Sequence, residues 1–248
     1  KILFEKAVRS SERSLGMDHP TTSVNYSNLA NLLDDLGDYR EAKSLLEKAI
    51  LTDEKKLGDG HPDTALKYSN LASVLEHLGD YQGAKTLLEK AKQSSEKYFG
   101  PDHPDTVLMN SKLAMIHLQN GDYQVALNLL EQAVLSAVKS FGPNHPTTSL
   151  HYSQLAMVLQ SVGDYHGARD LFEKVIHIAE KSYGIEHQNT AIAYSNFAMI
   201  LKDFGDYQKA LAFAQKAIDI LSLHLPIEHP TFKTISDNYK SIIYEMGN

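Results

Sequence analysis

Two short motifs recur along the chain in related forms. One copy of the first is Gly100-Pro101-Asp102-His103-Pro104, and 17 residues later comes a copy of the second, Gly121-Asp122-Tyr123-Gln124-Val125-Ala126. Their histidine and their Gly-Asp-Tyr triplet each recur every 42 residues. Proline suits the first turn of a helix, and glycine suits the position just past a helix end. Each 42-residue unit therefore predicts a first helix, from His-Pro to the glycine, and a second helix, from Asp-Tyr to the next glycine.

This repeat covers nearly the whole chain without an insertion. Its histidines are His19, His61, His103, His145, His187 and His229, and proline follows each of them except at Gln188. We therefore expect a single array over residues 1–248. The predicted parts are the second helix of a partial repeat over 1–16, full repeats over 19–60, 61–102, 103–144, 145–186 and 187–228, and the first helix of a further repeat over 229–248.

Alanines mark the places where neighbouring helices are expected to approach each other. They are Ala30, Ala72, Ala114, Ala156 and Ala198 in the first helices, and Ala42, Ala84, Ala126, Ala168 and Ala210 in the second helices. The aspartate of each Gly-Asp-Tyr is expected to cap the second helix, and the tyrosine to plug the seam between helices. Because each hairpin buries its apolar faces only against its neighbours, the sequence predicts an all-α solenoid of helix hairpins.

These residues resemble a known repeat family. Asn28-Leu29-Ala30, then Gly37-Asp38-Tyr39-x-x-Ala42, then Leu46 and Ala49, match the pattern of the tetratricopeptide repeat. The 42-residue interval and the Gly-x-x-His-Pro join resemble the kinesin light chain variety of that repeat. The resemblance implies a right-handed superhelix of antiparallel helix hairpins, in which the first helices line a concave groove that holds peptides.

Composition narrows the class of partner. The chain of 248 residues has a formal charge of −7 and no cluster of Lys and Arg, which argues against nucleic acid and anionic membranes as partners. No stretch approaches the roughly 20 apolar residues of a membrane span. The absence of cysteine fits a reducing compartment, so we expect a cytoplasmic protein that binds a neutral or basic segment.

Two rows of side chains are candidates for contact with a ligand in the groove. The row before the repeated Leu-Ala or Phe-Ala step is Asn28, Asn70, Lys112, Gln154 and Asn196, and the row after it is Asn31, Ser73, Met115, Met157 and Met199. Amides both donate and accept hydrogen bonds, so the first row can hold a peptide backbone. Methionines adapt to apolar side chains, although packing between repeats explains them too.

Charged and apolar residues near these rows indicate the chemistry of the expected ligand. Asp34, Asp35 and Glu76 lie in the early repeats and the three methionines in the later ones, so the ligand is expected to be polar or basic at one end and apolar at the other. A run of serines, such as Ser27 and Ser69, precedes the amide row, and close helix packing explains it as well as ligand contact does.

Chemistry other than binding finds little support in the sequence. Equivalent histidines in stacked repeats lie too far apart to share a metal ion, so a hydrogen bond in the turn or at the helix start is the expected role. The repeated aspartates read as helix caps, and no phosphate-binding loop or nucleophile motif stands out. We therefore expect no catalytic residues, no metal and no cofactor.

The predicted function is that of an adaptor or scaffold which binds a peptide or partner segment. The alternative is a regulatory or sensor array within a larger protein, controlling an effector such as a protease or an NTPase. Neither end carries an evident polar capping helix, so a piece of a longer array is expected, and self-association through the exposed ends is a further possibility.

Overall fold

The computed structural model describes residues 1–247, and within them the chain forms twelve helices and no strand. The predicted first helices are α2 (Pro20–Asp35), α4 (Pro62–His77), α6 (Pro104–Gln119), α8 (Pro146–Ser161), α10 (Gln188–Phe204) and α12 (Pro230–Met246). The predicted second helices are α1 (Ile2–Leu15), α3 (Tyr39–Lys56), α5 (Tyr81–Phe99), α7 (Tyr123–Phe141), α9 (Tyr165–Tyr183) and α11 (Tyr207–Ser222). The all-α prediction and its helix order are confirmed.

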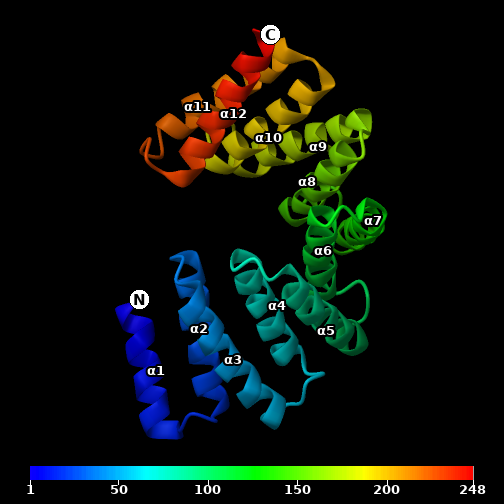
Figure 1. Cartoon of the computed structure of the whole chain (residues 1–248). Helices are drawn as coiled ribbons and strands as arrows, with labels where there is room; N and C mark the ends of the chain where they lie inside the picture. The colour runs from blue at the N-terminus through cyan, green and yellow to red at the C-terminus, as the bar shows by residue number, and fades with distance from the viewer. Residues whose placement is uncertain (248) are drawn as a thin grey trace. The chain divides into compact units, whose positions relative to one another are not determined.

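The chain divides into two compact units, Lys1–Asn120 with α1–α6 (unit 1) and Gly121–Asn248 with α7–α12 (unit 2). In unit 1, α2 packs on α3 and α4 on α5 as hairpins, and each hairpin also packs on the helix before and after it (Figure 1). In unit 2, α8 with α9 and α10 with α11 repeat that arrangement. The boundary falls inside the predicted repeat 103–144, so one continuous superhelical array over 1–248 stays a prediction.

The repeated histidines start the first helices. In all six, Nδ1 accepts a hydrogen bond from the backbone N–H two residues later, at 3.1–3.3 Å between the heavy atoms. This contact satisfies one of the free N–H groups at the helix start. The predicted hydrogen-bonding role is confirmed. It holds at His187 as well, where Gln188 replaces proline and α10 still begins at the same place.

The Gly-Asp-Tyr turn departs in part from the prediction. Gly37 has φ of 81°, a left-handed conformation that side-chain-bearing residues rarely adopt. Asp80, Asp164 and Asp206 cap the next helix by accepting from its backbone N–H groups. The capping prediction is wrong at Asp38, whose carboxylate accepts from Lys1 instead at 2.9 Å, and at Asp122, whose side chain makes no cap bond.

The alanine prediction is confirmed at every position, because all ten of these side chains have no exposed surface. The tyrosine prediction is wrong at Tyr81 and Tyr123, which are 42% and 41% exposed. Tyr39 is half-buried and stacks on His77 of the next repeat, with ring centroids 4.7 Å apart. Buried tyrosines come from the first helices instead, where Tyr26 and Tyr68 are 1% and 2% exposed.

Those first-helix tyrosines fasten the joins between repeats. The hydroxyls of Tyr26 and Tyr194 donate to Glu12 and Glu180 at 2.6 Å, and Tyr68 donates to Glu54 in the same way. Each pair lies 14 residues apart and links a second helix to the following first helix. Burial, with the bond to Glu12 next, raises the pKa of Tyr26 to about 12, and the same causes raise the pKa of Tyr68 and Tyr194.

A second bond recurs at the same joins. A buried threonine near the start of five of the six first helices donates from Oγ1 to the carbonyl of the glycine that follows the preceding helix, at 2.7–2.9 Å. The pairs are Thr22 with Gly16, Thr64 with Gly58, Thr106 with Gly100, Thr148 with Gly142, and Thr190 with Gly184. Phe232 stands in the next equivalent position, and there α11 ends early at Ser222, in a join without that glycine.

Adjacent threonines test this bond. Thr22→Val keeps the buried shape but removes the donor to Gly16, so we expect the free energy of unfolding to fall by about 1–2 kcal/mol. Thr21→Val changes an exposed neighbour and should leave it within about 0.5 kcal/mol. Urea denaturation followed by circular dichroism measures both, and equal losses would contradict the role of the bond.

The tyrosines predict an alkaline loss of stability. Their pKa is higher in the folded chain than the usual value near 10, so the folded state holds their protons more tightly. Their contribution is complete below pH 10 and is lost as the pH rises through the folded pKa, about 12 for Tyr26. The free energy of unfolding should therefore fall less between pH 9 and 11 in a Tyr26→Phe, Tyr68→Phe, Tyr194→Phe variant than in the parent. An identical pH profile would refute the assignment.

Candidate functional site

Unit 1 has a pocket of about 250 Å³ between α2 and α4, closed below by the end of α3. Three of the predicted ligand-contacting residues line it, namely Asn28, Asn31 and Asn70. Asn28 and Asn31 are exposed and Asn70 is half-buried. Within residues 1–247, the side chains of these three residues make no hydrogen bond to the rest of the chain, so their amides are available to a ligand.

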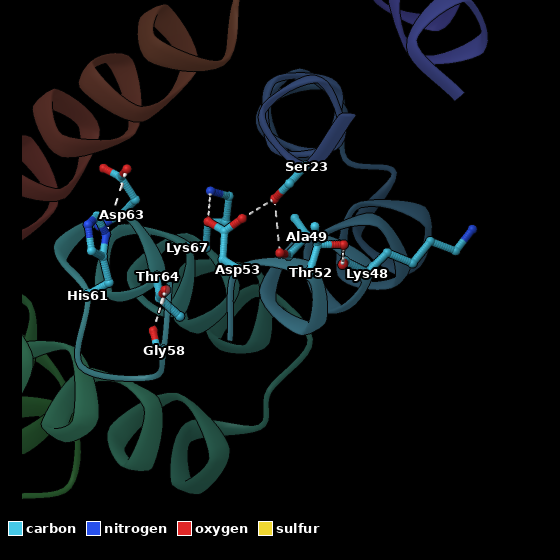
Figure 2. A network of polar contacts seen from close by, with 10 residues as sticks. All are labelled: Ser23, Lys48, Ala49, Thr52, Asp53, Gly58, His61, Asp63, Thr64 and Lys67. Carbon is cyan, nitrogen blue, oxygen red and sulfur yellow. Dashed lines mark hydrogen bonds and ion pairs between the residues drawn. The ribbon is translucent and has the colours of Figure 1, made fainter. Parts of the chain in front are cut away.

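A buried ion pair forms the floor of this pocket. The floor residues are Asp53 on α3 and Lys67 on α4, which are 2% and 6% exposed. Figure 2 shows the Lys67 ammonium and the Ser23 hydroxyl both directed at the Asp53 carboxylate. Ser23 lies 2.6 Å from Asp53 Oδ1, and Lys67 bonds to Oδ2. Each charge has its counter-charge, which is the condition for keeping such groups out of water.

Unit 2 has an equivalent pocket of about 200 Å³ between α8 and α10, with α9 below. Most of its lining residues stand three 42-residue intervals after lining residues of unit 1, so Asn196 takes the place of Asn70 and Ile192 that of Leu66. The floor differs in chemistry. Ala179 and Ala193 stand where unit 1 has Asp53 and Lys67, and they are 5% and 6% exposed.

The other predicted contact residues lie outside these two pockets. Lys112 donates to the Ser73 hydroxyl at 2.8 Å and to the Ser69 carbonyl at 3.4 Å, and burial lowers its pKa while Glu76 and Asp34 oppose that shift. Gln154 lies 3.3 Å from the ring of His151. Met115 and Met199 are half-buried, and Met157 is 40% exposed.

Sequence reasoning missed polar contacts that tie successive first helices together. Asp34 lies 2.8 Å from His77, Asn238 donates to Ser195 at 3.0 Å, and Lys202 pairs with Glu245 at 3.0 Å. The partners of each pair stand 43 residues apart, one more than the repeat. Complementary polar or charged side chains that stand 43 residues apart in the sequence could have indicated these contacts.

Sequence reasoning also missed the ion pair between Asp53 and Lys67 in the pocket of unit 1. Asp53 interrupts a row in which the equivalent positions carry Ser95, Ala137 and Ala179, and a charge among small residues is itself a signal. Among the described residues, no group of three or more His, Asp or Glu side chains is placed to hold a metal ion. No described helix is both long and apolar enough to cross a bilayer.

The helix hairpins stack on one another, and each 42-residue unit repeats the same buried alanines and the same histidine cap. These features define a helical repeat protein of the solenoid class. The family model described as tetratricopeptide repeat matches residues 2–55, 63–134, 105–176 and 147–222. The chain therefore belongs to the tetratricopeptide repeat family, as its sequence resemblance predicted. Members of this family typically mediate protein–protein interactions and are generally not enzymes.

Solved structures share the fold. BtubC from P. vanneervenii matches with a TM-score of 0.74 and 22% identity, covering 90% of this chain and 94% of its own. The nearly identical repeats of a kinesin light chain-like protein from Podosopora anserina match with a TM-score of 0.69 and 27% identity, covering 82% and 97%. A search of the curated proteins found no match.

A further match is to a multidomain protein. A signal transduction ATPase from Pyrococcus horikoshii, which carries a tetratricopeptide repeat sensor, matches with a TM-score of 0.70 and 17% identity. The alignment covers 99% of this chain but 37% of the ATPase, so the likeness concerns only part of that protein.

The floor pair makes a stability prediction. Asp53→Ala leaves the buried Lys67 ammonium without its partner, so the free energy of unfolding should fall by about 3–5 kcal/mol. Asp53→Ala with Lys67→Ala removes both charges and reproduces the floor of unit 2, so its loss should be clearly smaller. Urea denaturation of the two variants makes the comparison. A double variant as unstable as the single variant would show that the charges do not act as a pair.

Proposed function

We propose that the chain is an interaction module which binds an extended peptide, or a segment of a partner protein, across the first helices of each unit. The observation that carries this proposal is the row of unpaired amides in the two pockets. Asn28, Asn31 and Asn70 in unit 1, and Asn196 in unit 2, make no side-chain hydrogen bond within residues 1–247. A carboxamide beside a pocket can donate to a peptide carbonyl and accept from a peptide N–H.

The surrounding groups favour a segment without net negative charge. The chain has a formal charge of −7, and Asp63 lines the pocket of unit 1 next to the neutralised floor pair. An acidic segment would approach against this field, whereas a neutral or basic one would not. Apolar side chains beside the amides, such as Val24 and Leu66 in unit 1 and Leu150 and Ile192 in unit 2, add area that a ligand can cover.

Lys112 and Gln154 have a smaller part in this proposal than the asparagines. Lys112 uses its ammonium on Ser73 and Ser69, and Gln154 contacts His151, so binding a ligand would first break these contacts. The methionines contribute adaptable apolar surface, of which Met157 offers the most. The peptide row is therefore centred on the two pockets rather than spread evenly over the repeats.

A peptide library displayed on phage tests the proposal. We expect the intact chain to select peptides, and the Asn70→Ala, Asn196→Ala variant to bind the selected peptides about 10-fold or more weakly, because each lost hydrogen bond costs about 0.5–1.5 kcal/mol. The matched control is Asn128→Ala with Asn144→Ala, which removes two exposed asparagines outside the pockets. Equal losses in both variants, or no selected peptide, would refute the proposal.

The alternative is that the same pockets serve as a sensor for an effector domain. The fold match to the sensor-bearing ATPase favours testing it, since a tetratricopeptide repeat sensor is one part of that larger protein. The two roles differ in outcome. If the full reading frame encodes an NTPase or protease domain, addition of a selected peptide should change its activity in the sensor role and leave it unchanged in the adaptor role.

A further inference from the structure

Under each of the two pockets, one side chain from a second helix and one from the following first helix form the floor. We call these two residues, which stand 14 positions apart, the floor pair, and we give the same name to the equivalent two positions of the other joins. In chain order the floor pairs are Ser11 with Asn25, Asp53 with Lys67, Ser95 with Met109, Ala137 with His151, Ala179 with Ala193, and Leu221 with Ile235. All of these residues are buried except Asn25, which is half-buried.

The floor pairs change in chemistry along the chain. In unit 1, Asn25 donates to the Ser11 hydroxyl at 3.1 Å, and Asp53 binds Lys67. In unit 2, the pair Ala179 and Ala193 and the pair Leu221 and Ile235 have no polar side-chain atom. The join itself barely changes, since the histidine cap and the threonine bond to glycine are the same at Gly58 and at Gly184. One scaffold therefore presents a polar floor in one pocket and an apolar floor in the other.

In the pocket of unit 1, the floor favours a ligand side chain that forms hydrogen bonds. The Lys67 ammonium has three N–H donors, and one is used on Asp53. An apolar side chain seated there would close the pocket over the remaining donors without offering them a hydrogen-bond acceptor. A charged side chain would meet a floor whose two charges already cancel. A neutral carboxamide suits both the floor and the amides of Asn28 and Asn70 at the rim.

In the pocket of unit 2, the floor favours the opposite kind of side chain. Ala179 and Ala193 offer only methyl groups, and Leu150, Ile192 and the ring of Tyr183 line the sides. A large apolar side chain gains free energy there in proportion to the area it buries. A carboxamide would lose water there, and its polar neighbours would be the side residues Ser149, Ser153, Asn189 and Asn196, because the two alanines of the floor offer no hydrogen bond.

We propose that the floor pair decides which ligand side chain each pocket accepts: Asp53 with Lys67 selects a carboxamide side chain, and Ala179 with Ala193 selects a large aliphatic or aromatic one. This inference rests on the proposed peptide-binding function and gives its specificity. A segment bound by unit 1 then carries Asn or Gln at the position that enters the pocket, and a segment bound by unit 2 carries a residue such as Leu or Phe there.

Exchange of the floor pairs tests the inference on the full chain. Peptides selected by the parent are synthesised with either Gln or Leu at each position, and their affinities are measured by fluorescence anisotropy. At the peptide position that enters the pocket of unit 1, the parent should prefer Gln over Leu by about 10-fold. The variant Asp53→Ala with Lys67→Ala should reverse that preference to Leu. Glu5→Ala with Arg9→Ala, which removes an exposed ion pair from α1, should leave the preference unchanged.

A reciprocal variant keeps the test decisive if the first exchange weakens folding. Ala179→Asp with Ala193→Lys places the ion pair in unit 2 and should shift the preference at the other ligand position from Leu toward Gln. If the folded variants bind peptides with unaltered preferences while Asn70→Ala, Asn196→Ala still weakens binding about 10-fold or more, the floor-pair inference is overturned and the proposed function stands. If the parent binds no peptide, both are overturned.

Discussion

Helix packing in this chain depends on alanine at the points where neighbouring helices cross. A side chain as small as a methyl group lets two helix backbones approach to the shorter end of the usual 8–10 Å separation. The alanines that meet this requirement, such as Ala72 in a first helix and Ala84 in the second helix beside it, have no exposed surface. The bonds at the joins act only over hydrogen-bonding distances, so they too require that approach.

Because the joins are fastened by short bonds from fixed positions, each join keeps its geometry while its other side chains vary. The threonine bond to the preceding glycine carbonyl occurs at Gly58 and again at Gly184, within units that otherwise differ in sequence. Stability and recognition are therefore carried by different residues of one join. The backbone ends, caps and alanines fix the hairpins, and the floor and rim residues remain free to differ between pockets.

The sequence predicted the features that repeat at a fixed interval and depend on local turn chemistry. The helix order, the histidine caps and the buried alanines follow from proline, glycine and the 42-residue period. It failed where a side chain had two available partners. Asp38 was predicted as a cap, but its carboxylate accepts a hydrogen bond from Lys1, the residue just before α1. The tyrosines after Gly-Asp were predicted to plug the seam between helices, but Tyr81 and Tyr123 are exposed, because recurrence alone does not show which way a side chain points.

The pockets were predictable only in part, for a related reason. The amides of Asn28, Asn70 and Asn196 could be named from their register beside the Leu-Ala or Phe-Ala step. The ion pair beneath these amides could not be predicted from the sequence, because Asp53 and Lys67 meet across a join between two different repeats. A pairing of that kind becomes visible when the packing of one repeat on the next is known. The same limit applied to the contacts between residues 43 positions apart.

The buried ion pair also bears on how such an array can change through evolution. A neutral pair such as Ser11 and Asn25 can mutate one residue at a time, because each intermediate leaves no charge stranded. Asp53 and Lys67 lack that freedom, since either mutation alone isolates a buried charge. Lineages that acquired this pair would tend to retain it, whereas neighbouring joins drift freely. Among homologues, the join between the first two full repeats should therefore be the slowest to diverge.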